Sequence, residues 1–205
     1  MWLPILVTVL AGYLLGNING AVSMSTLLSH QDIREHGSGN AGLTNFVRTF
    51  GAARAILVFI IDFVKTVLAC LIGKLLLTPY GYSMEGLMLG AAAVSLGHDF
   101  PVLLGFHGGK GILCGLAIAA MADWRVAVII LAVFAGMVLI TRYVSVGSVL
   151  ACAAFIVSFW IFHYDQPFVA GAATFIGVFA IFMHRGNMAR LAKGTENKIF
   201  SGNKK

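Results

Sequence analysis

The run ARAILVFIIDFVKTVLACLIGKLLL, residues 53–77, decides the fold class because apolar side chains dominate it from end to end. A helix rises about 1.5 Å per residue, so roughly 20 apolar residues cross the hydrocarbon core of a bilayer. The run exceeds that length. We therefore predict a membrane-spanning helix in this part of the chain.

Similar apolar runs recur along the chain, and the candidate spans are 2–28, 53–77, 84–105, 111–123, 124–141, 144–162 and 167–184. Of the 205 residues, 59% are hydrophobic and 11% are charged, whereas about a quarter of a soluble domain is charged. The first run has no Lys or Arg, so we expect a retained span and not a cleaved signal peptide. The sequence predicts one all-α domain over residues 1–205, a polytopic bundle of about seven transmembrane helices.

The basic residues predict the orientation of the bundle. Alternate loops and the tail carry Arg34, Arg48, Arg54, Lys110, Arg142, Arg185, Arg190, Lys193, Lys198, Lys204 and Lys205, and the opposite side carries Lys74 and Arg125. The positive-inside rule then places the N-terminus outside and the C-terminus in the cytoplasm. Five full spans with two re-entrant pieces would preserve the same alternation. The rule also accounts for the net charge of +6, so no nucleic-acid partner is expected.

Three polar segments interrupt the apolar runs, and the first is GSGNAGLTNFVR, residues 37–48. Gly37, Gly39 and Gly42 allow backbone amides to turn inward, as in anion-binding nests. The planar guanidinium of Arg48 suits phosphate oxygens. Further hydrogen-bonding groups come from Ser38, Asn40, Thr44 and Asn45. The pattern favours a phosphate site over the alternative, a flexible loop with a positive-inside arginine.

The second segment is HDFPVLLGFHGGKG, residues 98–111, which ends in Gly108, Gly109, Lys110 and Gly111 before a helical run. Free N–H groups and a lysine would meet an anion at a helix start. The glycine spacing differs from a Walker motif. For His98 and His107 we expect packing or hydrogen bonding, because no Cys or carboxylate stands at a spacing that would complete a metal site.

The third segment is HRGNMARLAKGTENK, residues 184–198. If it is helical, His184, Asn187 and Leu191 share one face with Arg190 beside it. An imidazole and an amide would then point together into the mouth of the bundle. The alternative is a basic cytoplasmic end that meets lipid headgroups.

Inside the apolar runs, Asp62 and Lys65 are three residues apart, so they can pair on one helix face. We expect a structural or site-supporting pair and not a catalytic one. Ser148 is a further candidate site residue, although a serine there also serves close helix packing. Cys70, Cys114 and Cys152 all lie within apolar runs, and neither a disulfide nor a metal site is expected.

Together the three segments resemble the signature segments of the bacterial acyl-phosphate:glycerol-3-phosphate acyltransferases, the PlsY family. The resemblance covers the whole chain in order and spacing. It implies a multi-span enzyme of the bacterial inner membrane, with its active site facing the cytoplasm, that transfers a fatty acyl group from a long-chain acyl phosphate to the 1-hydroxyl of sn-glycerol 3-phosphate. Lysophosphatidic acid and phosphate would be the products of this first acylation in phospholipid synthesis. The implied partners are these substrates, membrane lipids and the enzyme that produces acyl phosphate; no cofactor or metal is implied.

Matching the segments residue by residue gives a set of site residues. The catalytic candidates are Ser38, Arg48, Lys110 and His184. The substrate-binding candidates are Gly37, Gly39, Asn40, Thr44, Asn45, His98, Gly108, Gly109, Gly111, Asn187, Arg190 and Glu196, to which we add Ser148. Family members often carry Lys at the position of His107 and Val-Ala-Thr in place of Ile112-Leu113-Cys114, so neither stretch receives a role.

Several alternatives stay open at this point. The hydroxyl proton can pass to His184, whose unperturbed pKa suits a base near neutral pH, or to an oxygen of a substrate phosphate. Neighbouring Arg185 and Arg190 would lower that pKa or restrict the ring. A covalent acyl-enzyme at Ser38 is a weaker hypothesis. Outside enzyme catalysis, broken helices with glycine-rich ends also suit a transporter for an anionic metabolite, and a purely structural membrane protein is the third alternative.

Overall fold

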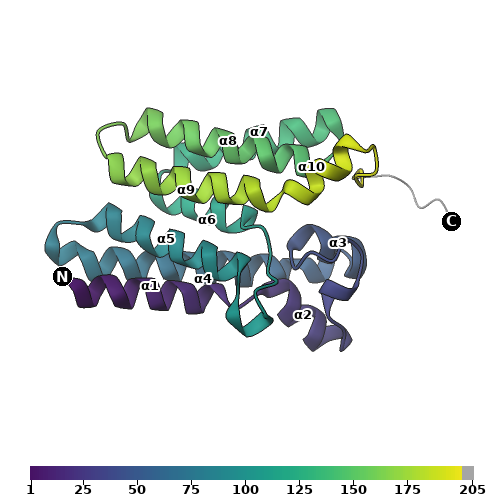
Figure 1. Cartoon of the computed structure of the whole chain (residues 1–205), viewed down its shortest axis with the longest axis horizontal. Helices are drawn as coiled ribbons and strands as arrows, with labels where there is room; N and C mark the ends of the chain where they lie inside the picture. The colour runs from purple at the N-terminus through teal and green to yellow at the C-terminus, as the bar shows by residue number, and fades with distance from the viewer. Residues whose placement is uncertain (200–205) are drawn as a thin grey trace. The chain divides into compact units, whose positions relative to one another are not determined.

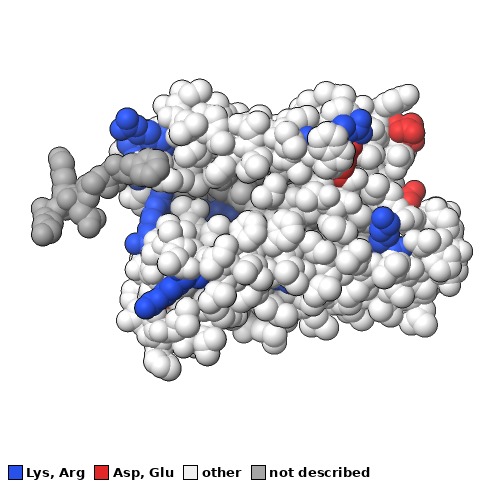
Figure 2. All heavy atoms as spheres, turned by 180° about the vertical axis from the view of Figure 1, so that it is seen from behind, with Lys and Arg blue, Asp and Glu red and all other residues white. Residues whose placement is uncertain are grey.

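The computed structural model describes residues 1–199, and every regular element in this range is a helix. Helices satisfy their own backbone hydrogen bonds, which lipid cannot do. The chain divides into two compact units, the first ending at Ala122 and the second beginning at Asp123. Among the described residues on the face shown in Figure 2, Lys, Arg, Asp and Glu occupy only small areas, and the other residue types form most of the surface. This is the surface expected of a protein surrounded by lipid.

The first unit is built on three helices that run side by side, α1 (Trp2–Gly16), α4 (Ala52–Leu77) and α5 (Ser83–Asp99) (Figure 1). Helix α6 (Ile112–Ala122) packs against α4 and α5. The shorter elements are α2 (Gly20–Ser29), η1 (Ile33–Glu35), α3 (Leu43–Phe50), η2 (Thr78–Tyr80) and η3 (Val102–Leu104). The polar loops of this unit follow α2 and α5, where these helices end.

Helices α4 and α5 approach closely at Gly73 and Gly86. A Cβ atom on either glycine would collide with the carbonyl oxygen of the other. Small residues allow helix backbones to pack tightly in lipid, where the hydrophobic effect does not drive helices together. The two glycines therefore fix how α5, and the loop that follows it, lie against α4.

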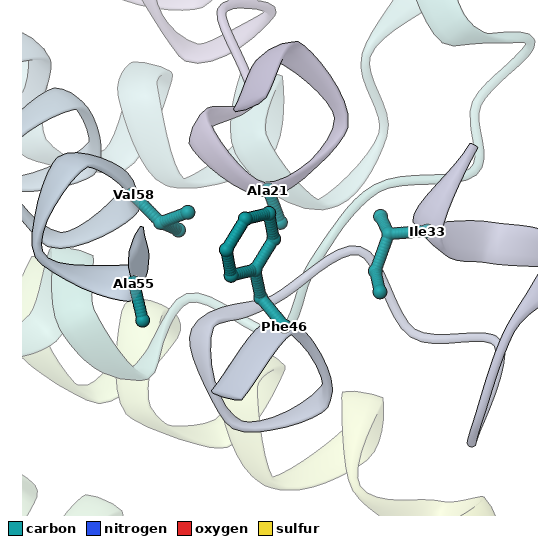
Figure 3. Packing of buried hydrophobic residues seen from close by; sticks show 5 residues of the cluster. All are labelled: Ala21, Ile33, Phe46, Ala55 and Val58. Carbon is teal, nitrogen blue, oxygen red and sulfur yellow. The ribbon is translucent and has the colours of Figure 1, made fainter. Parts of the chain in front are cut away.

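A buried apolar cluster holds α2, η1 and α3 onto α4. Figure 3 shows the ring of Phe46, from α3, surrounded by Ala21, Ile33, Ala55 and Val58. Phe46 is 1% exposed. Helix α3 has only eight residues, too few to be stable alone. Its position, and that of the loop before it, therefore depends on this cluster.

The second unit contains α7 (Trp124–Thr141), α8 (Val144–Phe162), α9 (Pro167–Met183) and α10 (Arg185–Ala192). Helix α8 packs against α7 and α9, and α9 contacts α10. The side chain of Asp123 caps α7 by accepting a hydrogen bond from the Arg125 N–H. Helices α9 and α10 meet at His184 with a bend of 46°.

The predicted spans are helical, and the predicted ranges 124–141 and 144–162 coincide with α7 and α8. Five segments are long and apolar enough to cross a membrane: Trp2–Ser29, Ala52–Tyr80, Ser83–Leu104, Trp124–Thr141 and Val144–Phe162. The bent pair α9 and α10 would make a sixth. The predicted 111–123 span contains only the 11 residues of α6, about 16 Å of helix, roughly half of the hydrocarbon core. The seven-span count and the orientation stay predictions, and two of the tail lysines used for them, Lys204 and Lys205, lie outside the described residues.

The predicted 2–28 span contains a break that sequence analysis missed. Helix α1 ends at Gly16 and α2 begins at Gly20. Asn19 precedes α2, and its side-chain oxygen accepts a hydrogen bond from the Val22 N–H at 3.0 Å. An asparagine before a helix is a common start signal, and it could have indicated this break.

Candidate active site

The first polar segment is a loop that folds around the side chain of Asn45. This buried amide donates hydrogen bonds to the carbonyl oxygens of Ile33 (3.2 Å), His36 (2.9 Å) and Asn40 (3.1 Å). Its oxygen accepts a hydrogen bond from the Ser38 N–H at 2.9 Å. The amide that we assigned to substrate binding is thus engaged inside the loop, where it sets the path of the backbone.

Glycine is required at the turn of this loop. Gly37 has a φ of +60°, and a Cβ atom there would collide with the Asn45 side-chain oxygen. Gly39, with φ of +72°, makes the next turn. As a result, the side chains of Ser38, Thr44 and Arg48 are exposed, and Asn40 is half-buried. These are the groups of the first segment that a soluble phosphate ester can reach.

Helix α3 begins directly after this loop. Gly42 precedes its first residue, and no side chain caps the helix start. The first N–H groups of a helix have no carbonyl partner within the helix, and they favour an anion. Thr44, in the first turn, adds an exposed hydroxyl. The arrangement agrees with the expected phosphate-binding chemistry of the segment.

The second polar segment folds back onto the end of α5. The N–H of Gly109 donates to the carbonyl oxygen of His98 (3.0 Å), and the N–H of Gly108 donates to that of Asp99 (3.2 Å). A Cβ atom on Gly109 would collide with His98 Nε2. Gly111, with φ of +69°, turns the chain into α6. Lys110 is half-buried between these glycines.

The first and second segments lie side by side. An ideal Cβ built on Gly109 would be 3.0 Å from the carbonyl oxygen of Ala41. The same carbonyl accepts a hydrogen bond from the Asn19 side-chain amide at 3.0 Å. The two segments are far apart in sequence, and this contact brings them together within the first unit.

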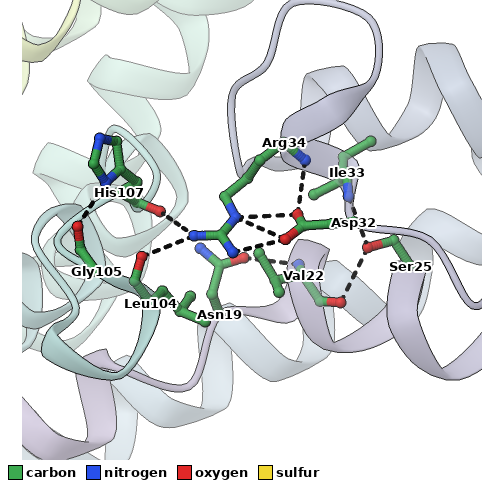
Figure 4. A network of polar contacts seen from close by, with 9 residues as sticks. All are labelled: Asn19, Val22, Ser25, Asp32, Ile33, Arg34, Leu104, Gly105 and His107. Atoms are coloured by element: carbon green, nitrogen blue, oxygen red, sulfur yellow. Dashed lines mark hydrogen bonds and ion pairs between the residues drawn. The ribbon is translucent and has the colours of Figure 1, made fainter.

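Arg34 forms a second link between the two segments, as Figure 4 shows. Its guanidinium pairs with Asp32, with Nη2 2.7 Å from Oδ2. Its Nη1 donates to the Leu104 carbonyl at 2.8 Å and to the His107 carbonyl at 3.5 Å. The hydrogen bond from Arg34 holds the pKa of Asp32 below its ordinary value. Sequence analysis used Arg34 only as a positive charge, because the carbonyl acceptors of a distant loop have no sequence signal.

Beneath these loops lies a buried polar centre. Asp62 and Lys65 form the predicted pair on α4, with Oδ1 2.9 Å from Nζ. The same Nζ lies 2.9 Å from Nδ1 of His98. All three side chains are buried. The pairing of Asp62 with Lys65 is confirmed, and its extension to His98 was not predicted.

The third segment belongs to the second unit. His184 is buried at the junction of α9 and α10, and its Nδ1 lies 2.8 Å from the Ala180 carbonyl oxygen. A carbonyl oxygen only accepts hydrogen bonds, so Nδ1 carries the proton and the neutral ring has its lone pair on Nε2. This is the tautomer that a general base needs at Nε2. The bend separates α9 from α10, whereas the carbonyl of His184 accepts a hydrogen bond from the Met188 N–H at 3.0 Å, so His184 belongs to the first turn of the helix that carries Asn187.

Glu196 joins the other candidates of the third segment. Its carboxylate accepts hydrogen bonds from the Asn187 amide (2.7 Å) and from Arg190 Nε (2.8 Å). Burial raises the pKa of Glu196. The hydrogen bonds from Asn187 and Arg190, together with the nearby Ser145 hydroxyl, lower this pKa by more than burial raises it. The pKa therefore lies below its ordinary value, and the carboxylate holds Asn187 and Arg190 in place.

Ser148 takes a different position from the other candidates. Its side chain is buried, and its hydroxyl donates to the Val144 carbonyl within α8 at 2.9 Å. A hydroxyl that bonds back to its own helix is common in apolar helices. A substrate-binding role for Ser148 stays a prediction, as does the expectation that all three segments line one site.

Comparison with known proteins covers nearly the whole chain. The family model described as glycerol-3-phosphate acyltransferase matches residues 6–194. Proteins of that name from Finegoldia magna (35% identical, covering 91% of this chain and 92% of the relative) and Alkaliphilus metalliredigens (38%, covering 95% of each) are similar. Two crystal structures of PlsY, an integral membrane glycerol 3-phosphate acyltransferase, are also similar, and each match covers 95% of both chains. The glycerol 3-phosphate form is 32% identical with a TM-score of 0.86, and the lysophosphatidic acid form is 31% identical with a TM-score of 0.83. With its long apolar helices, the chain is a multi-pass bacterial membrane protein.

Proposed function

Because this chain belongs to the glycerol-3-phosphate acyltransferase family, we propose that it transfers a fatty acyl group from acyl phosphate to the 1-hydroxyl of sn-glycerol 3-phosphate. The hydroxyl oxygen attacks the acyl carbonyl carbon, and the bond between that carbon and the phosphate oxygen breaks. The products are lysophosphatidic acid and inorganic phosphate. The hydroxyl proton passes to a base or to a phosphate oxygen.

One observation carries this proposal: the glycine-rich loop and the Gly-Gly-Lys segment lie against each other at Ala41 and Gly109. Together they offer the uncapped start of α3, the exposed Arg48 and the half-buried Lys110. Both substrates carry a phosphate, and the carbonyl oxygen becomes negative during attack. Several positive and N–H groups in one polar region suit these demands.

Positioning and charge stabilisation supply most of the proposed rate acceleration. Holding two reactants in line can be worth about 7–11 kcal/mol. Arg48 and Lys110 are the groups proposed to hold phosphate and stabilise the developing oxyanion, with Ser38, Asn40 and Thr44 as neutral hydrogen-bonding groups beside them. Asn45 and Arg34 act indirectly, because their hydrogen bonds fix the backbone that carries these side chains.

His184 is the proposed base. Its Nδ1–H donates to the Ala180 carbonyl, which leaves Nε2 as the acceptor for a hydroxyl proton. Asn187 and Arg190, both bound to Glu196, are proposed to bind substrate in the same region of the chain. Acyl phosphate is an activated donor, so proton transfer to a substrate phosphate oxygen is the alternative route.

The proposed active site faces the cytoplasm. Glycerol 3-phosphate is soluble, whereas the acyl chain stays in the bilayer, so a site at the membrane surface serves both. The positive-inside distribution of Lys and Arg supports the cytoplasmic side. Because acyl phosphate is the proposed donor, we also propose a functional link to the enzyme that makes it.

The decisive experiment uses the purified protein with acyl phosphate and glycerol 3-phosphate, scored for lysophosphatidic acid and phosphate. Acyl-thioester donors serve as the control and are expected to give no product. Sequential kinetics are expected, whereas ping-pong kinetics or a trapped acyl group on Ser38 would indicate a covalent intermediate. Uptake of glycerol 3-phosphate into proteoliposomes without acylation would overturn the proposal in favour of a transporter.

A further inference from the structure

Lys65 lies at the buried polar centre of the first unit, and its ammonium contacts four acceptors. Two are the carbonyl oxygens of Gly16 (3.2 Å) and Ile18, at the break between α1 and α2. The others are Asp62 Oδ1 and His98 Nδ1, each at 2.9 Å. The Lys65 side chain is 3% exposed. These contacts join three separate parts of the fold at one nitrogen atom.

The ammonium determines the tautomer of His98. Lysine has three N–H donors and no acceptor, so His98 Nδ1 must accept. The neutral ring then carries its proton on Nε2. A doubly protonated ring would place a second positive charge and an N–H directly against the ammonium. The carboxylate of Asp62 forms an ion pair with Lys65.

The Nε2–H of His98 is directed at the junction of the first two polar segments. A side chain on Gly109 would collide with Nε2, and the same Cβ position lies 3.0 Å from the Ala41 carbonyl oxygen. Lys110 follows immediately in sequence. Within residues 1–199 the hydrogen-bond contact of the His98 ring is made by Nδ1, with Lys65, and the His98 side chain is 5% exposed. Nε2 therefore lies at the expected anion site as the ring atom able to donate to a ligand.

We propose that Lys65 is a positioning residue that fixes His98 as an Nε2–H donor to a substrate phosphate oxygen held beside Gly109. This inference rests on the proposed function and adds two roles to it. His98 is a neutral hydrogen-bond donor and not a general base. Lys65 acts on the substrate through His98, without touching it. Asp62 also accepts a hydrogen bond from the Gly20 N–H at 3.1 Å, so the same pair holds the start of α2.

The alternative is a purely structural lysine that ties together the break between α1 and α2. In that case the proton of His98 would have no effect on substrate binding, and loss of Lys65 would change stability alone. The two roles differ in the tautomer of His98 and in the kinetic constant that changes. Both can be measured.

The first test reads the tautomer directly. The ¹⁵N NMR spectrum of histidine-labelled wild-type protein in detergent, with His98 assigned by the signals lost in His98→Gln, is expected to show a protonated Nε2 and an unprotonated Nδ1. A proton on Nδ1 would overturn the proposal. This result does not depend on catalysis, so it stands even if the proposed acyl transfer is absent.

The second test is kinetic. Glutamine places its N–H₂ group near the position of histidine Nε2, and asparagine places it near Nδ1. We expect His98→Gln to retain more activity than His98→Asn. The lost hydrogen bond to a charged group in His98→Asn should raise one substrate KM by about 10- to 100-fold. Measuring KM for both glycerol 3-phosphate and acyl phosphate identifies which phosphate His98 holds. Equal KM values for the two variants would contradict the donor role.

The matched pair Lys65→Met and Lys74→Met isolates the role of the lysine, since both residues lie on α4 and Lys74 is only half-buried, away from the polar centre. Lys65→Met is expected to raise the same KM by about 10-fold or more and to mix the His98 tautomers, whereas Lys74→Met should match wild type. Unchanged KM values in folded Lys65→Met would refute the positioning role. If Lys65→Met does not fold, the wild-type ¹⁵N spectrum and the comparison of His98→Gln with His98→Asn still test the proposal. A wild-type protein that makes no lysophosphatidic acid would defeat the proposed function alone.

Discussion

The hydrogen bonds of Asn45 give the sharpest test of how the first polar loop is built. The substitution Asn45→Asp keeps the shape of the side chain and the oxygen that accepts from Ser38. It removes the amide that donates to Ile33, His36 and Asn40, and it places a carboxylate oxygen against three carbonyl oxygens. The loop should therefore open while the helical fold persists.

The magnitude follows from the burial of each partner. The bond to the Ile33 carbonyl is buried, and leaving such a group unpaired costs about 1–3 kcal/mol. The bonds to His36 and Asn40 are partly buried, and each is worth about 0.5–1.5 kcal/mol. The NH₂ group has two protons for three acceptors, so one buried and one partly buried bond count in full. They predict a loss of about 1.5–4.5 kcal/mol in local stability, which makes opening of the loop at least about 10-fold more frequent.

Hydrogen–deuterium exchange measures this opening directly. Peptides covering residues 37–45 should exchange at least about 10-fold faster in Asn45→Asp, whereas peptides from α4 should keep the wild-type rate. Acyl transfer should fall together with the protection. Val47→Ala, on the exposed face of the same helix, is the matched control and should resemble wild type in both assays. Wild-type exchange in Asn45→Asp would refute the assignment of this side chain to loop structure.

Three further outcomes are expected. Gly109→Ala should abolish acyl transfer because its methyl group would collide with His98, whereas Gly115→Ala, with open space around it, should not. His184→Ala should lower the single-turnover rate by about 100-fold or more; a normal rate with weakened binding would assign the proton to a substrate phosphate. The pKa of Glu196 is lower in the folded protein than its ordinary value of 4.5, so the carboxylate stabilises the fold at pH values above 4.5. This stabilisation is lost as the pH falls through the lower pKa of the folded state. The difference in thermal stability between wild type and a Glu196→Gln variant should therefore vanish at acidic pH; a constant difference would contradict the ion pair.

The apolar pattern was sufficient to predict the helices, because lipid leaves an apolar chain few other ways to satisfy its backbone. The break before Gly20 was missed because the surrounding residues are apolar enough to resemble one continuous span. The predicted run 111–123 agrees with α6 to within one residue at each end. Helix α6 begins directly after the glycine turn of the second segment, and its 11 residues are too few for a full crossing.

The spacing of residues in the sequence predicted the Asp62–Lys65 pair but not the contact of Lys65 with His98. Asp62 and Lys65 pair because residues three apart share a helix face. The contact of Lys65 with His98 joins α4 to α5 and depends on how closely these helices approach. The separation of residues along the sequence does not predict that approach. For Asn45, the sequence could not indicate the hydrogen bonds that its side chain makes within the loop, because the acceptors are backbone carbonyls. Its contact with substrate stays a prediction.

The Asp62–Lys65 pair also has a consequence for the order in which the chain assembles. A lone charge at the centre of an inserting helix costs about 2.5–3.5 kcal/mol. Here both partners lie on the same helix, with Nζ 2.9 Å from Oδ1, so they can neutralise each other before any other helix is present. Helix α4 can therefore enter the bilayer by itself. The tie to His98 forms later, when α5 docks, and the polar centre is completed only in the assembled protein.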